Sequence, residues 1–92
     1  MKNPDLISDN LREAVAQLQK TIDCLASGQR FGTRVPQAYT EQNLEVDLHH
    51  AQHHINVAWH IRQENRDKII ACAPEDFELW SRPWSTEAGR AQ

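Results

Sequence analysis

One long stretch of this 92-residue chain contains neither glycine nor proline, and it limits the folds that are open to the chain. Thr40 is a favourable residue for capping a helix N-terminus, and no glycine or proline follows it until Pro74. Glu41 stands in the first turn, where the positive end of the helix dipole stabilises a negative charge. We therefore predict one helix over residues 41–72, and about thirty residues make it roughly 45 Å long.

A first helix is predicted over residues 9–27 from the spacing of its apolar residues. They recur at steps of three and four, which places on one side of a helix Leu11, Val15, Leu18, Ile22 and Leu25. Asn10 and Glu13 have capping-box spacing near its start, and an earlier start at Pro4 is the alternative. Gly28 is a natural end for this helix. We expect its apolar stripe to pack against the long helix.

Glycine and proline also mark the remaining segments. Two glycines and a proline make residues 28–40 a connector between the two helices. Pro74, followed by two acidic residues, predicts a short third helix over residues 74–80, and the polar residues 85–92 are expected to be a flexible tail. The predicted fold is all-α and a single small domain, in which an antiparallel helical hairpin carries a short C-terminal helix.

Composition argues against several classes of function. The net charge is −3 and the basic residues are scattered, so no nucleic-acid partner is indicated. No run approaches the ~18 apolar residues of a membrane span, and no apolar signal segment is recognised, so we expect a cytoplasmic protein that does not enter membranes. Cys24 and Cys72 are expected to be thiols, and no motif of a known catalytic class is present, so no catalytic residue is assigned.

All five histidines lie in the long helix, on two of its sides. The main apolar stripe of this helix consists of Leu44, Leu48, Ala51, Ile55, Ala58, Trp59 and Ile69. We expect that stripe to face the first helix. His49, His53 and His60 lie opposite it and are expected to be solvated, with a surface metal site at His49 and His53 as the alternative. His50 and His54 lie on a third side of the helix.

The third side also carries a second apolar stripe, formed by Val46, Val57 and Ile61. Either aromatic residues of the C-terminal segment cover this stripe or another subunit does. Two helices and a short third make a thin core, so we expect a homodimer or a higher oligomer, with another protein as a further candidate partner. The predicted interface residues are Val46, Val57, Ile61, Phe77, Trp80 and Trp84.

His50 and His54 are four residues apart, so both can reach one cation on the helix surface. Neutral imidazole is a common ligand for zinc and nickel, but two ligands hold a metal ion poorly and a third has to come from outside this helix. The alternative is that both rings form hydrogen bonds within a helical interface, or donate to carboxylates such as Glu13 or Asp23.

The run HHAQHHINVAWHIRQ is similar to the metal-binding helix of the DinB/YfiT-like family, where a His-Ala-x-His-His run precedes an aliphatic stretch and an arginine. The resemblance implies a four-helix bundle that holds a divalent metal with three histidines, two of them matching His50 and His54. Some members are thiol-dependent transferases, an activity that we do not carry over. This chain has no histidine outside the long helix, so the resemblance implies dimerisation and a third ligand from the partner.

Two functions follow from the sequence. The favoured one is a small helical homo-oligomeric module for interaction or assembly, without catalytic activity and without a cofactor. The alternative is a DinB-like bundle that binds Zn²⁺ or Ni²⁺ through His50 and His54, with further ligands from another subunit.

Overall fold

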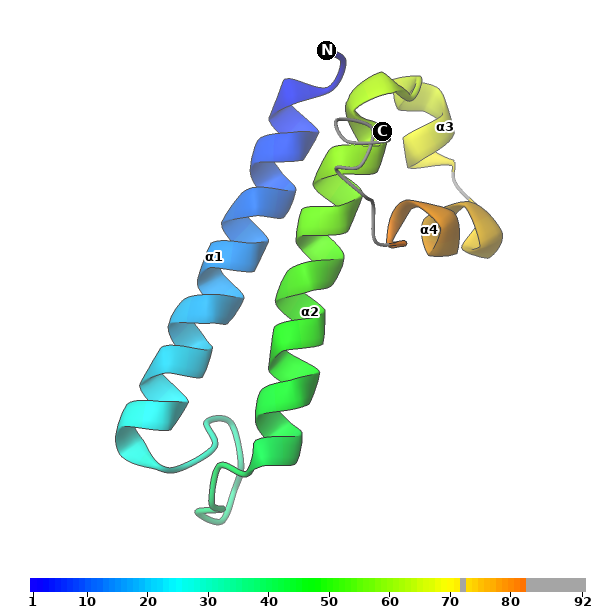
Figure 1. Ribbon diagram of the computed structural model, residues 1–92. Helices are drawn as coiled ribbons and strands as arrows, with labels where there is room; N and C mark the ends of the chain where they lie inside the picture. The colour runs from blue at the N-terminus through cyan, green and yellow to red at the C-terminus, as the bar shows by residue number, and fades with distance from the viewer. Residues whose placement is uncertain (72, 83–92) are drawn as a thin grey trace, which may run out of the picture.

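The computed structural model describes residues 1–71 and 73–82. Two long antiparallel helices lie side by side, and shorter helical segments follow at one end of the hairpin (Figure 1). In chain order, the elements are α1 (Pro4–Ser27), α2 (Glu41–His60), the 3₁₀ turn η1 (Ile61–Gln63), α3 (Arg66–Ile70) and α4 (Pro74–Trp80). The described residues form no strand beyond an isolated bridge between Gln29 and Ala38. The predicted all-α hairpin with a short C-terminal helix is thus confirmed, and the predicted tail over residues 85–92 lies outside the described residues.

The helix starts follow local chemistry. α1 begins at Pro4, the earlier of the two predicted starts, because proline has no N–H to leave unbonded in the first turn. Asn10 takes no part in a capping box, since its amide nitrogen donates to the Leu6 carbonyl oxygen (3.0 Å). The capping box belongs to α2, where Thr40 and Asn43 bond to each other's backbone N–H groups. α4 starts at a proline as predicted.

The predicted helix over residues 41–72 is wrong in its second half. α2 ends at His60, and the backbone is extended at Glu64 before α3 begins. The end is fixed by the chain's N-terminus, because the side-chain amide of Asn3 donates to the carbonyl oxygens of Ile61 (2.9 Å) and Glu64 (2.8 Å). Carbonyl groups at a helix end need such partners, so a distant asparagine stabilises a break that no glycine or proline marks.

The contact between α1 and α2 uses small and polar residues, and Ala51 and Ala58 are the buried members of the α2 stripe that we predicted to face α1. On the side of α1 that faces α2, the buried residues are Ala14, Gln17, Thr21 and Cys24. Ala51 and Ala58 are buried on α2. At 100° per residue, this line lies about a quarter turn from the Leu11–Leu25 stripe. The helices therefore meet along one edge of the apolar stripes, and the large side chains of the stripe of α1 remain exposed, as do Leu48 and Trp59 of α2.

α4 covers the second apolar stripe of α2. Val57, Ile61 and Trp80 form the buried cluster, with relative exposures of 6%, 1% and 3%, and Leu6, Ile7 and Ile69 pack around it. These three are therefore core residues of the single chain and not interface residues, which corrects the prediction. The C-terminal segment therefore covers the second apolar stripe, which is one of the two alternatives that we predicted. Val46 is exposed, while Trp84 and the side chain of Phe77 lie outside the described residues.

Replacing Asn3 by alanine should lower the free energy of unfolding by about 1–3 kcal/mol, because the carbonyl oxygens of Ile61 and Glu64 lose a largely buried donor. Urea denaturation followed by circular dichroism measures this change. Gln63→Ala is the matched control, since that side chain lies in the same turn but is exposed, and it should change stability by less than about 0.5 kcal/mol. Equal losses in the two variants would contradict the role given to Asn3.

Candidate functional site

The structure brings the two predicted histidines together against α1. His50 and His54 lie one turn apart on α2, with their ring centroids 5.0 Å apart. The Oε1 atom of Gln17 is 2.6 Å from His50 Nδ1, and the Oδ1 atom of Asn10 is 3.0 Å from His54 Nδ1. The two Nε2 atoms lie 3.2 Å from each other. Both rings thus form hydrogen bonds within the helical interface, one of the predicted alternatives, and their partners are amides of α1 and not the carboxylates of Glu13 or Asp23.

The hydrogen bonds around Gln17 determine which nitrogen of His50 carries the proton. The Thr21 hydroxyl donates its proton to the Gln17 backbone carbonyl oxygen (2.8 Å), so its oxygen accepts from the Gln17 amide nitrogen (3.2 Å). That bond turns Gln17 Oε1 toward His50. Because an amide oxygen only accepts, His50 Nδ1 is the donor of this pair.

The same reasoning applies to His54. The amide nitrogen of Asn10 donates to the Leu6 carbonyl oxygen, which leaves Asn10 Oδ1 to accept from His54 Nδ1. With both Nδ1 atoms protonated, two neutral rings present a lone pair at each Nε2. These lone pairs of His50 and His54 point at one another across 3.2 Å.

Two lone pairs that face each other repel, and a proton or a metal ion between the two rings would remove that repulsion. A proton on one Nε2 gives a hydrogen bond to the other, and a divalent metal ion bound to both removes the same repulsion. Zinc–imidazole bonds are about 2.0–2.1 Å long, so two tetrahedral ligands of one ion lie roughly 3.3–3.4 Å apart. The observed separation of 3.2 Å is close to that value. The described geometry therefore suits two of the ligands that a metal site needs.

The electrostatic surroundings favour the neutral form of His54 and His53. Burial lowers the pKa of His54, and the positive charge of His50 lowers it further, against the carboxylate of Glu13, which raises it. Burial, followed by the charges of His54 and His50, lowers the pKa of His53 as well. The neutral imidazole is the form that binds metals.

The described part of the chain supplies no third ligand. No group of three histidine, cysteine, aspartate or glutamate side chains is close enough there to hold a metal ion. His49 is exposed, and His53 has its ring edge-on to His54 at 5.1 Å. The Nε2 atom of His60 donates to the Arg82 carbonyl oxygen (2.6 Å) beyond α4. His49 and His53, the alternative pair, line one surface pocket.

A second candidate site is a continuous apolar surface on one side of the hairpin. We call it the apolar face, and its members are Leu11, Val15, Leu18, Ile22 and Leu25 of α1 with Leu48, Ile55 and Trp59 of α2. Seven of them are exposed, from 37% for Leu18 to 65% for Val15, and Ile55 is half-buried. Leu11, Ile55 and Trp59 line one groove, so the stripes of both helices lie on the same side.

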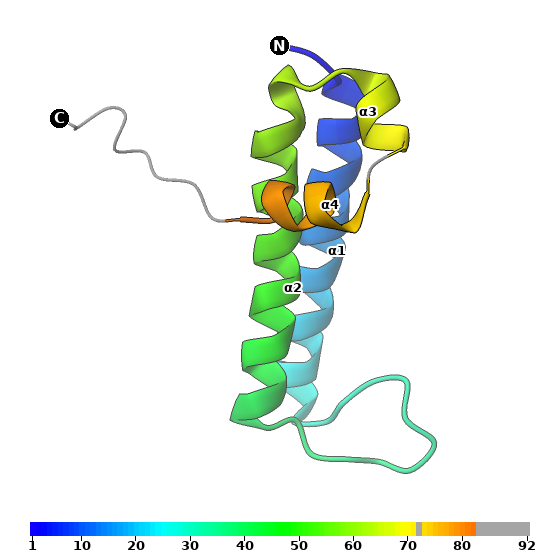
Figure 2. The same cartoon turned by 90° about the vertical axis from the view of Figure 1, so that its right-hand side faces the viewer.

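No described segment covers the apolar face. α4 packs on Val57 and Ile61, which lie on another side of α2. The connector lines a cavity with Lys20 and Val46, again away from the face. In Figure 2 the connector projects to the right of the two long helices, and α4 lies across them on the side toward the viewer. The opposite side is therefore open to solvent in the described part of the chain.

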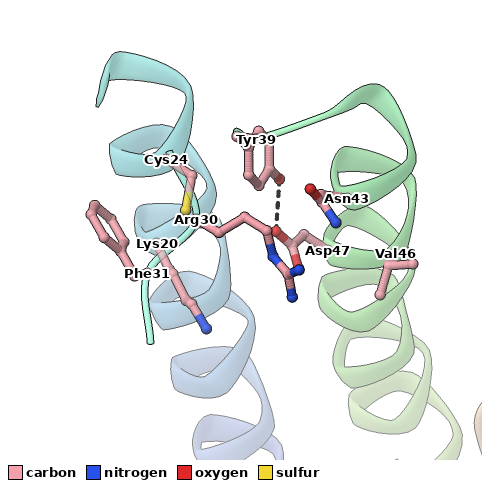
Figure 3. A pocket seen from close by; sticks show the side chains of 8 residues that line it. All are labelled: Lys20, Cys24, Arg30, Phe31, Tyr39, Asn43, Val46 and Asp47. Atoms are coloured by element: carbon pink, nitrogen blue, oxygen red, sulfur yellow. Dashed lines mark hydrogen bonds between the residues drawn. The ribbon is translucent and has the colours of Figure 1, made fainter. Parts of the chain in front are cut away.

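The cavity beneath the connector has a volume of about 220 Å³ (Figure 3). It is lined by Lys20, Cys24, Arg30, Phe31, Tyr39, Asn43, Val46 and Asp47. Two of its charged groups bond within the chain, because Tyr39 donates its hydroxyl to Asp47 Oδ2 (2.7 Å) and Arg30 donates to Gln37 Oε1 (2.9 Å). Cys24 is 2% exposed. We assign this cavity a structural role, which is to fasten the connector to the helices.

Tyr39, the only tyrosine of the chain, should ionise at unusually high pH. Burial, and after it the hydrogen bond to Asp47 and the charge of that carboxylate, raises its pKa from 10.0 to about 12. Because the pKa is raised in the folded state, the stabilising effect of this contact is complete below pH 10 and is lost as the pH rises toward 12. The ultraviolet absorbance of tyrosinate follows this titration directly.

In the Asp47→Asn variant, the midpoint should fall part of the way toward 10, since the effect of burial remains. Glu45→Gln is the control, because it removes a neighbouring charge without touching the hydroxyl. A midpoint that does not move in Asp47→Asn would contradict the assigned contact.

Comparison with known proteins returns no matching family model, no similar curated protein and no similar solved structure. Among the described residues, no helix has both the length and the apolar character needed to cross a membrane.

Proposed function

We propose that this chain is a non-catalytic assembly module that forms a homodimer by burying its apolar face against a second copy. The observation that supports this proposal is the extent of the face, which runs along both long helices with seven exposed apolar side chains. Monomeric soluble proteins rarely leave so large a continuous apolar surface in water. Fully burying one aliphatic side chain stabilises the complex by roughly 1.5–3 kcal/mol. Several such residues together can offset the translational and rotational entropy that is lost on association.

A second copy suits this face because a two-helix hairpin is half of a four-helix bundle. In a twofold dimer, the same surface patch is used on both subunits, so the two apolar faces would form one core between the hairpins. The small residues between α1 and α2 already allow each hairpin to form alone, and the dimer would supply the apolar layer that a single hairpin lacks. Another helical protein is the alternative partner.

Replacing Leu18 by glutamate should convert the dimer to a monomer, because Leu18 lies near the centre of the apolar face and a buried charge opposes association. The dissociation constant should rise at least about tenfold. Light scattering coupled to size-exclusion chromatography measures the mass.

Val46→Glu is the matched control, because Val46 is an exposed apolar residue on the other side of α2. It should leave the dimer intact. If Val46→Glu dissociates the dimer and Leu18→Glu does not, the interface is the one predicted from the sequence. A wild-type protein that is monomeric would refute the proposal.

As a second function, we propose that His50 and His54 bind a divalent metal ion, Zn²⁺ or Ni²⁺. The supporting observation is the pair of Nε2 lone pairs 3.2 Å apart, with each ring oriented by an amide of α1. A metal-binding histidine commonly donates its other ring nitrogen in this way, which fixes its tautomer. The pair is turned away from the apolar face, so a dimer formed through that face leaves water or a further chain to complete the coordination.

Titration calorimetry with zinc should detect binding that is lost in the His50→Ala, His54→Ala double variant. Gln17→Ala should weaken binding by about 10–100-fold, because the His50 ring loses the acceptor that orients it. His49→Ala is the control and should bind as the wild type does. No binding by the wild-type protein would exclude this function, and loss of binding in His49→Ala would assign the metal to His49 and His53.

A further inference from the structure

We infer that the second copy docks antiparallel, with α1 against α1 of the partner subunit and α2 against α2. This inference rests on the proposed dimer and adds its orientation. Two hairpins that meet through the same face can be related by a twofold axis along the helices or by one across them. The first places α1 against the partner's α2 with the connectors at the same end. The second places each helix against its own copy with the connectors at opposite ends.

Charged residues at the two ends of the apolar face distinguish these arrangements. At the connector end, Asp23 follows Ile22 of the face, and Glu41 lies two helical turns before Leu48 on the same side of α2. Both carboxylates are exposed. The connector end of the face is therefore acidic at its margin.

At the other end, the margin of the apolar face is basic. Arg62 lines the groove formed by Leu11, Ile55 and Trp59, and its guanidinium lies 3.5 Å from the centre of the Trp59 ring. Arg12 lines a second pocket of the face, beside Leu11. Thus α1 contributes one acidic residue at one end of the face and one basic residue at the other, and so does α2 together with the η1 turn that follows it.

An antiparallel dimer brings opposite charges together on both helices. Arg12 would lie beside Asp23 of the partner subunit along the α1 pair, and Arg62 would lie beside Glu41 of the partner subunit along the α2 pair. The twofold axis repeats each contact, so four opposite-charge contacts form. The parallel dimer would instead place Arg12 at the same end as Arg62 of the partner subunit, and Asp23 at the same end as Glu41 of the partner subunit, each pair offset along the helices by about five residues, or about 7.5 Å. Like charges disfavour that orientation.

One axis serves both helix pairs. The midpoint between the charged residues of α1 falls between Gln17 and Leu18, and that between the charged residues of α2 falls between Ala51 and Gln52. Gln17 is in direct contact with His50, so the two midpoints lie at nearly the same height along the hairpin. A twofold axis through this level, across the centre of the apolar face, relates both pairs of charges at once.

Other charges near the face do not reverse this pattern. Asp5 is paired with Arg66 (2.9 Å). Asp9 lies 3.2 Å from Arg12, but the two side chains are 65% and 77% exposed, and such an exposed pair contributes little. Lys20 lies on the side of the connector cavity.

Cysteine cross-linking tests the orientation in the full chain with Cys24 and Cys72 replaced by alanine. In an antiparallel dimer, Leu18→Cys lies near the twofold axis and should form a disulfide with its own copy under mild oxidation. A mixture of Leu11→Cys and Leu25→Cys chains should give the mixed disulfide. A parallel dimer should instead cross-link a mixture of Leu11→Cys and Ile55→Cys chains, and that result would overturn the inference.

Charge reversal gives an independent readout from the dimer dissociation constant. Glu41→Arg should weaken the antiparallel dimer about threefold to tenfold, and adding Arg62→Glu in the same chain should restore it. In the parallel dimer, Glu41→Arg would relieve repulsion and strengthen association, which would overturn the inference. A dimer that fails these tests refutes only the orientation, whereas a monomeric wild-type and Cys-free protein refutes the proposed function itself.

Discussion

The close contact between α1 and α2 through small and polar residues determines most other features of this molecule. Ala14, Ala51 and Ala58 let the helices approach, and a layer that includes Gln17 satisfies its own polar atoms by hydrogen bonds. Because this contact lies about a quarter turn from the apolar stripes, it leaves those stripes facing outward together. The exposed apolar face and the oriented histidine rings both follow from which sides of α1 and α2 meet in this contact.

The histidine pair shows how a polar interhelical layer can prepare a site. Thr21 orients Gln17, which orients His50, and the Leu6 carbonyl orients Asn10 in the same manner for His54. In each case a backbone carbonyl of α1 fixes the orientation of the side-chain amide. The amide oxygen then faces the ring and accepts a hydrogen bond from Nδ1, so Nδ1 carries the proton. The two Nε2 atoms are left facing each other, 3.2 Å apart.

Residue patterns predicted the helices better than their contacts. The periodicity of α1, the cap at Thr40 and the proline of α4 are local features, and each was found at or near its predicted place. The break after His60 was missed because its cause is Asn3, which is distant in sequence. The amide partners of the histidines could have been found only by aligning the two helices in register. The exposed stripe was misassigned because an apolar pattern identifies a surface that avoids water without identifying what covers it.

The sequence by itself determined that the chain is all-α, that α2 starts after Thr40, and that His50 and His54 share one side of α2. These properties depend on residues within a few positions of one another, where propensity, capping and helical periodicity act. Only the tertiary structure decided which side of each helix became the interior. That choice depends on how closely two backbones can approach and on which distant polar groups find partners. The hydrophobic pattern along one helix gives no information about either factor.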